Sequence, residues 1–141
     1  MLKWLVVKIE YILVDEENRN EYKNRIVEYY NRYFPEESNK LIAKHSDLFW
    51  LAIKDKELVG VTRMLTDFSR YALLLDLIVR KSKRNQGIGK TLVKLAEKYC
   101  KDQGISHLIL TTDSRTDWLT GFYEKVDFKV VTDQTLMEYK L

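Results

Sequence analysis

The chain has 141 residues with 45% apolar content, which suffices for one domain with a buried core and excludes two. Its 24 basic and 21 acidic residues leave a formal net charge of +3, so overall charge does not point to nucleic acid or an anionic membrane. The lone Cys100 excludes an internal disulfide framework, and we expect a cytoplasmic protein. Lys3, Lys8 and Glu10 interrupt the apolar N-terminal stretch, so we expect neither a signal sequence nor a membrane-spanning helix.

The first half of the chain shows a change of period from strand to helix and back. β-branched and aromatic residues at the N-terminus indicate a strand, and tyrosines at helical spacing then indicate a helix with Asp15 as its N-cap. Two further strands, joined by the charged turn Asp55-Lys56-Glu57, predict a hairpin. The expected elements are a strand over 4–14, a helix that ends before Pro35, a helix over 36–45, and strands over 48–54 and 58–66.

The second half predicts a strand–helix–strand unit followed by a helix and two closing strands. The run 72–79 is apolar except for Asp76, as in a central strand that is covered on both faces. A helical stripe begins after Gly87 and is closed by Gly104. The remaining elements expected are a strand over 106–112, a helix over 116–126, and strands over 128–131 and 136–140. This order predicts a sheet with both parallel and antiparallel pairs.

Between strand and helix lies RNQGIGKT, residues 84–91, which has the composition of a phosphate-binding loop. The loop does not match a nucleotide P-loop, because Arg84 stands where that motif has its first glycine. A dinucleotide fingerprint fails as well, because Leu92 stands at the third glycine position. What remains is an anion site, in which backbone N–H groups at the helix N-terminus bind phosphate and Arg84 and Lys90 add charge. The alternative is an ordinary strand-to-helix turn that uses glycine for its dihedral angles.

Further features of the sequence follow the loop: a predicted helix, the strand LILTT and the segment FYEKVDF. Together these motifs resemble the GNAT superfamily of acetyl-CoA-dependent N-acetyltransferases over about residues 48–131. The resemblance implies a single domain over 1–141 with a mixed, mostly antiparallel sheet flanked by helices on both faces. It also implies that the loop binds the pyrophosphate of coenzyme A and that the preceding strand pairs with its pantetheine. The residues so implicated are Arg84, Asn85, Gln86, Gly87, Ile88, Gly89 and Lys90 for the loop, and Leu77, Ile78 and Val79 for the strand.

Within the superfamily, the segment 60–79 resembles the branch that includes arylalkylamine (serotonin-type) N-acetyltransferases. The residues that carry this likeness are Arg63, Asp67, Ala72, Asp76 and Val79. Two positions depart from the family pattern, because Thr116 replaces an asparagine and Asp127 replaces a glycine. The first departure puts one hydrogen bond in question, and the second predicts an altered turn after the last helix.

Two aspartates are candidates for deprotonating or attracting the substrate amine. An alkylamine with a pKa near 10.4 requires about 4 to 5 kcal/mol for deprotonation at neutral pH, so a base helps. Asp76 is the ionisable group of the central strand and is either that base or the buried ion-pair partner of Arg63. If residues 69 and 70 form the turn, Arg63 and Asp76 lie opposite each other. Asp67 either attracts the substrate ammonium or caps the turn.

Tyr123 matches the family tyrosine that faces the thioester sulfur, so the resemblance assigns it to thiolate departure. A phenol is a weaker acid than a thiol, so stabilisation of the thiolate by a hydrogen bond is at least as plausible as proton transfer. The alternative for Tyr123 is a core aromatic on an amphipathic helix. A backbone N–H of Leu77 or Ile78 is the expected donor to the carbonyl oxygen.

We therefore expect an N-acetyltransferase that moves the acetyl group of acetyl-CoA directly to a primary amine of a small molecule. The alternative from another class is a non-catalytic acyl-CoA-binding module that regulates a protein partner. His45 and His107 lack ligand partners at metal-site spacing, so no metal is expected. The basic cluster 80–84 lies beside the anion loop, so a nucleic-acid partner is not expected. The identity of the amine stays open, and so does a homodimer.

Overall fold

The structure, a computed structural model, describes residues 8–141. These residues form two compact units, one up to Leu110 and one from Thr111 to Leu141. The first unit contains β1 (Glu10–Val14), α1 (Arg19–Tyr30), α2 (Glu36–His45), β2 (Leu48–Lys54), β3 (Glu57–Thr66), β4 (Tyr71–Val79), the short 3-10 helix η1 (Lys81–Lys83), α3 (Ile88–Gln103) and β5 (His107–Ile109). The second unit contains α4 (Asp117–Glu124).

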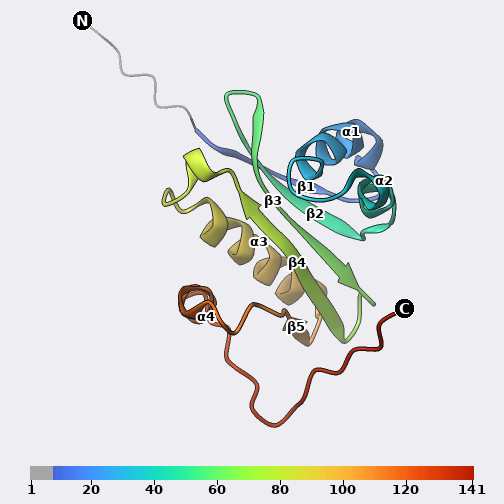
Figure 1. The fold of residues 1–141 in the computed structure, drawn as a ribbon. Coiled ribbons are helices and arrows are strands. Elements are labelled where there is room, and N and C mark those ends of the chain that lie inside the picture. The colour runs from blue at the N-terminus through green and yellow to red at the C-terminus, as the bar shows by residue number, and fades with distance from the viewer. Residues whose placement is uncertain (1–7) are drawn as a thin grey trace, which may run out of the picture. The chain divides into compact units, whose positions relative to one another are not determined.

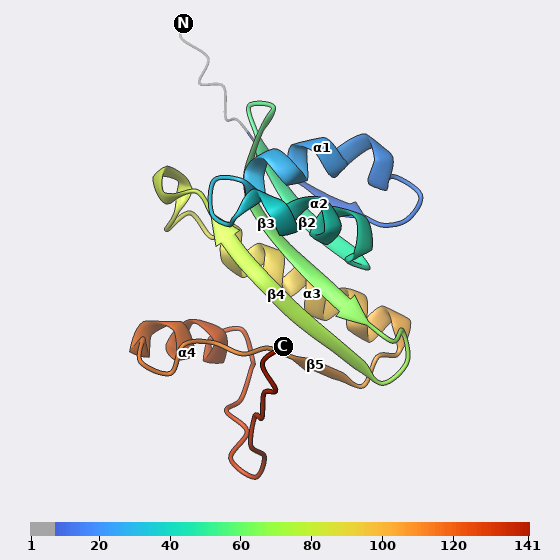
Figure 2. The ribbon, with the colours of Figure 1, turned by 45° about the vertical axis from the view of Figure 1, so that its right-hand side comes forward.

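The first unit is a twisted five-stranded sheet in the order β1-β2-β3-β4-β5 (Figure 1). The first four strands pair antiparallel, whereas β4 and β5 pair parallel because α3 carries the chain back between them. Helices α1 and α2 lie on one face of the sheet and α3 lies on the other, as the rotated view makes clear (Figure 2). The predicted mixed, mostly antiparallel sheet with helices on both faces is confirmed.

Apolar side chains fill both faces of this sheet. Under α1 and α2, alternate residues of the strands pack against one another and against the two helices; these are Val14, Ile26, Tyr29, Tyr30, Ala43, Phe49, Leu51, Ile53, Leu58 and Val61. On the other face, Trp50 meets Tyr99 of α3 edge to face, with ring centroids 5.6 Å apart. Tyr29 and Tyr30, two of the tyrosines at helical spacing, are both buried in this core.

The start of α1 differs from the expectation. The helix begins at Arg19 with Asn18 as its N-cap residue, so the prediction of Asp15 as the cap was wrong. Both side chains instead form the turn that precedes the helix: Asn18 Oδ1 accepts the N–H of Asp15 at 2.8 Å, and Asp15 Oδ1 accepts the N–H of Glu17 at 2.9 Å. Asx turns and N-caps use the same residue types, so composition alone does not separate them. Positions 4–7 of the first predicted strand lie outside the described residues.

The end of the chain also differs. β5 spans three residues, His107–Ile109, rather than 106–112, and neither 128–131 nor 136–140 is a strand. In these two segments Val130, Leu136, Met137 and Tyr139 are largely exposed. The alternation of apolar and polar residues was sufficient to predict strands there, but a strand also needs a neighbour that accepts and donates its backbone hydrogen bonds. No helix within 8–141 has the length and apolar character needed to cross a membrane.

The turn after α4 keeps a left-handed residue in spite of its sequence. Asp127, which stands where the resemblance expects glycine, has a φ of 75°. The N–H of Phe128 donates to the carbonyl oxygen of Tyr123, and the N–H of Asp127 donates to that of Glu124, both at 3.1 Å. This pair of bonds is the Schellman arrangement that ends many helices. The expected alteration of the turn is therefore not observed, because aspartate itself takes this conformation.

Candidate active site

The carboxyl half of β4 is the first part of the site. β5 pairs with β4 only along Tyr71–Leu73, so the ladder between these strands ends well before Leu77, Ile78 and Val79. All three of these residues are half-buried. On the other side β3 continues, with Val61 opposite Ile78 and Gly60 opposite Val79. The strand is thus held firmly from one side over the segment that was predicted to pair with pantetheine.

A β-bulge interrupts β4 just before this segment. Arg63 lies opposite Leu75 and Val61 lies opposite Ile78, so Thr62 alone faces both Asp76 and Leu77. Asp76 has a φ of 54°, the left-handed conformation, and the Thr62 hydroxyl donates to the carbonyl oxygen of Leu75 at 3.0 Å. The register predicted from the turn was therefore wrong by one residue, because it placed Arg63 directly opposite Asp76.

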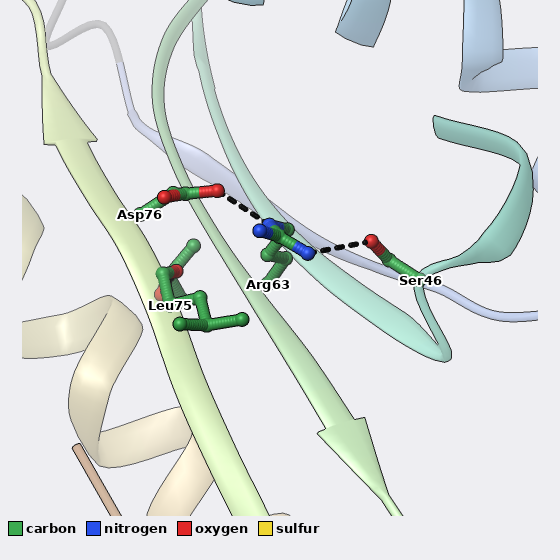
Figure 3. A network of polar contacts seen from close by, with 5 residues as sticks. Ser46, Arg63, Leu75 and Asp76 are labelled. Carbon is green, nitrogen blue, oxygen red and sulfur yellow. Dashed lines mark hydrogen bonds and ion pairs between the residues drawn. The ribbon is translucent and has the colours of Figure 1, made fainter. Parts of the chain in front are cut away.

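The predicted ion pair between Arg63 and Asp76 is nevertheless formed. Arg63 Nε donates to Asp76 Oδ2, and the Arg63 Nη1 donates to Ser46 Oγ at 3.2 Å (Figure 3). The two charged side chains are 15% and 20% exposed, so both are largely removed from water. Tyr30 of α1 is fully buried near them; burial, and then the negative charge of Asp76, raise the pKa of its hydroxyl. The bulge thus turns the Asp76 side chain to the face covered by α1 and α2.

The loop 84–90 follows the end of β4. Asn85 and Gly87 both have left-handed backbone, with φ of 64° and 80°, and α3 begins at Ile88 without a side-chain cap on its first turn. Arg84 Nε donates to the carbonyl oxygen of Val79 at 3.0 Å, which ties the loop to the strand end. The structure therefore brings together the strand residues and the loop residues that the sequence predicted. Uncapped N–H groups at the start of a helix favour an anion.

Charge around the loop is mostly positive. Lys81, Arg84 and Lys90 are exposed; they lie in η1, in the loop and in the first turn of α3, whose N-terminus is itself partly positive. Arg80 is partly neutralised, because its Nη1 binds Glu57 Oε2 at 3.0 Å. These cations would attract a phosphate-bearing ligand through the charge alone, and a guanidinium would add paired hydrogen bonds.

Ile88 contributes to the loop through its backbone only, because its side chain is buried in the core. It packs on Gly60 of β3, where an added Cβ would lie 2.9 Å from Ile88 Cγ2 and 3.2 Å from Leu92 Cδ1. Gly60 thus lets α3 approach the sheet closely, which fixes the position of the helix N-terminus. Sequence reasoning missed this residue; the signal was a glycine inside an apolar strand, which often marks a close approach.

Tyr123 lies on α4 in the second unit. Its ring meets Phe122 and Phe128 edge to face, with centroids 5.0 Å and 5.8 Å away. Burial raises the pKa of its hydroxyl above the ordinary value for tyrosine. The group therefore stays protonated at neutral pH and can donate a hydrogen bond, but it cannot serve as a base. Thr116 is the N-cap residue of α4 and forms no side-chain cap hydrogen bond.

Other candidate groups have structural roles. Asp67 Oδ1 accepts the backbone N–H groups of Tyr71, Ser69 and Arg70, and these bonds lower the pKa of its carboxyl. Of the two roles left open for Asp67, these contacts show the cap of the β3–β4 turn. Cys100 is buried, and burial raises the pKa of its thiol, so it is a poor nucleophile. Within residues 8–141, no three histidine, cysteine or acidic side chains gather as metal ligands would.

Comparison with known proteins identifies the family of this chain. The chain matches the sequence profile described as the Acetyltransferase (GNAT) family over residues 8–128. The chain belongs to this family. The match extends through the first unit and into the second as far as residue 128. It confirms, at the level of the family, the predicted resemblance to acetyltransferases.

The individual GNAT proteins that the chain resembles share limited sequence identity with it. Human N-acetyltransferase 8 is 29% identical over 93 residues, which is 62% of this chain and 41% of that protein. The chain thus spans about two fifths of the length of the curated relatives it matches. Among solved structures, a GNAT family acetyltransferase from Streptococcus pneumoniae has a TM-score of 0.72 at 25% identity, with 96% of this chain and 98% of that chain covered. The aminoglycoside N-acetyltransferase AAC(6')-Iy, solved in complex with CoA, has a TM-score of 0.74 at 11% identity, with 99% of each chain covered.

The GNAT fold of the first unit also contains a cavity of about 500 Å³ at another place. It is lined by Asp15, Glu16, Glu17, Arg19, Lys44, His45, Ser46, Asp47, Leu48, Phe68 and Tyr99. These residues come from the turn after β1, the start of α1, the end of α2 and the start of β2, the β3–β4 turn and the last part of α3. Several of its charged groups are already engaged: Arg19 donates to the carbonyl oxygens of Ala43 and Asp47, and Asp47 Oδ2 accepts the N–H of Thr66. The cavity includes none of the predicted site residues.

Proposed function

We propose that this GNAT protein transfers the acetyl group of acetyl-CoA directly to a primary amine of a small molecule. One observation carries the proposal: β4 loses its β5 partner where the loop 84–90 and the start of α3 meet its end. A strand with one unpaired edge beside a positive helix N-terminus suits a ligand that has both an amide-containing arm and a diphosphate. Coenzyme A has this chemistry, and it is bound in the AAC(6')-Iy structure of the same fold.

In this proposal, pantetheine lies along Leu77, Ile78 and Val79, and its amides exchange hydrogen bonds with the strand backbone. The pyrophosphate lies on the N–H groups of the loop from Arg84 to Lys90. Gly87 suits this contact, because a Cβ built on it would meet no atom within 4 Å and the space remains open to a ligand. Acetyl-CoA is consumed as a cosubstrate, and no metal takes part.

The chemical step joins the amine to the thioester. The neutral amine nitrogen attacks the carbonyl carbon, the carbon–sulfur bond breaks, and the proton of the attacking nitrogen passes to water as the thiolate departs, which leaves the acetylated amine and coenzyme A. We assign Tyr123 to the departing thiolate as a hydrogen-bond donor, since its raised pKa keeps the hydroxyl protonated. The same rise makes full proton transfer to a thiolate less favourable, because the phenol becomes an even weaker acid.

The carbonyl oxygen gains negative charge during the attack and needs a donor. We assign this role to a backbone N–H at Leu77 or Ile78, directly after the bulge. Asp76 lies at the bulge itself and belongs to the catalytic region either as a base or through its ion pair with Arg63. The contacts favour the second role, because the Asp76 carboxylate is engaged by Arg63.

The acceptor is proposed to be a small-molecule amine. The resemblance of residues 60–79 to arylalkylamine N-acetyltransferases supports an amine of that kind, and the fold shared with an aminoglycoside N-acetyltransferase supports the broader class. We further propose that the two units act together as one domain over 1–141, because the family match continues from the first unit into the second. A homodimer stays a prediction.

The first experiment is a calorimetric titration with acetyl-CoA, followed by thiol-release assays with tryptamine, spermidine, an aminoglycoside and a lysine peptide. We expect acetyl-CoA binding and turnover on one of the first three amines. Turnover on the lysine peptide alone would overturn the small-molecule assignment. Binding without turnover on any amine would favour the non-catalytic acyl-CoA-binding module.

Replacement of Tyr123 by phenylalanine tests the proposed role of its hydroxyl. Tyr123→Phe should lower kcat by roughly 10- to 100-fold and leave the Kd of acetyl-CoA unchanged, because the donor acts on the departing thiolate. Tyr139→Phe is the matched control, since Tyr139 is an exposed tyrosine of the same unit. Equal kcat values for the two variants would show that Tyr123 takes no part in the reaction.

A further inference from the structure

The bulge in β4 is built on an unfavourable residue. Asp76 has positive φ inside a strand, where glycine is the usual residue at a bulge of this kind. Aspartate tolerates this conformation better than most residues, yet it still prefers negative φ. Something outside Asp76 must therefore hold the bulge at this point of the strand.

The contacts around Asp76 supply that support from two elements. Arg63 of β3 pairs with the Asp76 carboxylate and reaches on to the hydroxyl of Ser46, which follows α2 and is buried. Thr62, the one residue opposite the bulge, holds the preceding carbonyl oxygen of Leu75 at 3.0 Å. As Figure 3 shows, the Arg63 side chain reaches both Asp76 and Ser46. This network joins β4 to β3 and to the start of β2.

We infer that the Arg63–Asp76 ion pair is a positioning device, which fixes the β4 bulge and so sets the direction of the Leu77 and Ile78 backbone. This inference rests on the proposed function, because it gives the ion pair a purpose at the proposed cofactor strand. A bulge shifts by one residue the side to which each following N–H points. The ion pair thus determines which backbone groups after Asp76 face a bound thioester.

The surroundings of Asp76 oppose a role as the base. The groups that face its carboxylate are the Arg63 guanidinium from β3 and the Tyr30 hydroxyl from α1. Proton uptake by Asp76 would leave the largely buried Arg63 charge without its partner, which is costly. The same carboxylate would also have to leave the geometry that holds the bulge. Positioning and general base catalysis are therefore competing roles for one side chain.

Three substitutions of Asp76 separate these roles. Asn keeps a hydrogen-bond acceptor for Arg63 and tolerates positive φ, Gly keeps the dihedral angle without the contact, and Ala keeps neither. For a positioning residue we expect kcat to fall in the order Asp76→Asn, Asp76→Gly, Asp76→Ala, from about threefold for Asn to about 100-fold for Ala. The pH–rate profile of Asp76→Asn should match that of the wild type. If Asp76 is the base, all three variants lose turnover equally, which would overturn the inference.

Arg63→Met tests the other half of the pair. Positioning predicts that it lowers kcat about as much as Asp76→Gly does, whereas a base would gain proton affinity when the neighbouring cation is removed. Asp102→Asn is the matched control, because it breaks the exposed Lys98–Asp102 ion pair of α3 and should leave turnover unchanged. Rates are measured below the melting temperature of each variant. A lower melting temperature with wild-type kcat would reduce the pair to a purely structural role and overturn the inference.

Backbone amide NMR provides a readout that does not depend on turnover. In Arg63→Met and Asp76→Ala, the amide signals of Leu77 and Ile78 should move, while those in Asp76→Asn should stay near the wild-type positions. Unmoved signals in all variants would overturn the inference even if the enzyme is active. Failure of the proposed function shows differently, as a wild-type protein with intact signals that neither binds acetyl-CoA nor acetylates any amine.

Discussion

Two residues with left-handed backbone stand at opposite ends of the proposed cofactor strand and loop, and they are held in different ways. Gly87, with a φ of 80°, precedes α3 and meets nothing in the space beside it. Asp76, with a φ of 54°, begins the β4 bulge and is bound by Arg63 from the neighbouring strand. The glycine adopts its conformation without help, whereas the aspartate depends on a contact made by a distant part of the chain.

The difference teaches where the precision of such a site comes from. A loop that presents N–H groups to a phosphate needs only the correct dihedral angles and open space, both of which glycine provides. A strand that must offer particular backbone groups to a ligand needs a fixed register, and the register depends on the adjoining strand. We therefore expect substitutions at Gly87 to act locally and substitutions at Asp76 or Arg63 to act through β3.

For stability and for the binding of coenzyme A, substitution of Gly87 gives the largest expected effect. Gly87→Ala puts a Cβ on a left-handed residue, which costs about 1 to 2 kcal/mol of stability. It also fills the space that the pyrophosphate is proposed to use, so the Kd of coenzyme A should rise at least about tenfold, or ~1.4 kcal/mol. Calorimetric titration and urea unfolding measure the two quantities.

The same helix supplies the matched control. Gly104, at its other end, has a φ of 74° and also meets nothing within 4 Å. Gly104→Ala should therefore lose about the same stability as Gly87→Ala but bind coenzyme A like the wild type. Weaker binding in both variants would mean that the loss comes from the helix as a whole, and it would break the distinction drawn for Gly87.

Tyr29 contacts β4 just after the bulge, so it reports on how the strand end of the proposed site is held. Its hydroxyl donates to the carbonyl oxygen of Ile78 at 3.0 Å, and burial raises its pKa. Because the folded-state pKa lies above the unfolded value near 10, the contribution of Tyr29 is present below pH 10 and is lost as the pH rises above it. Between pH 8 and pH 11, Tyr29→Phe should lose about 1 kcal/mol less unfolding free energy than the wild type. Parallel losses in urea titrations at the two pH values would show that Tyr29 ionises normally in the folded protein.

Much of the first unit was predictable, because its signals are local. Residue periodicity predicted the order of strands and helices, and the glycines at 87 and 104 marked both ends of α3. The place of the loop between β4 and α3 was predictable for the same reason, since a glycine such as Gly87 marks a turn by its own conformational freedom. The ion pair of Arg63 and Asp76 was predictable as a pairing, because a charged residue in a buried strand needs a partner.

What the sequence did not predict depends on neighbours. Position 76 holds an aspartate rather than the glycine that would have indicated a bulge, because its left-handed backbone is stabilised by Arg63 from the neighbouring strand. The predicted register was therefore wrong by one residue. The segments 128–131 and 136–140 have a strand pattern, but a pattern does not supply a pairing partner. Gly60 was missed because its importance lies in the approach of Ile88 from another element.

The smallest expected effect concerns Lys56, a left-handed residue that lies outside the proposed cofactor site. Asp55 and Lys56, with φ of 51° and 65°, form the two-residue turn between β2 and β3, where Asn-Gly or Asp-Gly is preferred. Lys56→Gly should raise the unfolding free energy by about 0.5 to 1 kcal/mol in urea titrations, because glycine relieves the strain of positive φ. The Arg25 contact to the Lys56 carbonyl oxygen is kept, since that atom belongs to the backbone. A gain here beside impaired turnover in Asp76→Gly would separate two effects. Glycine relieves backbone strain at both positions, whereas the control of register depends on the contact between Asp76 and Arg63, which glycine removes.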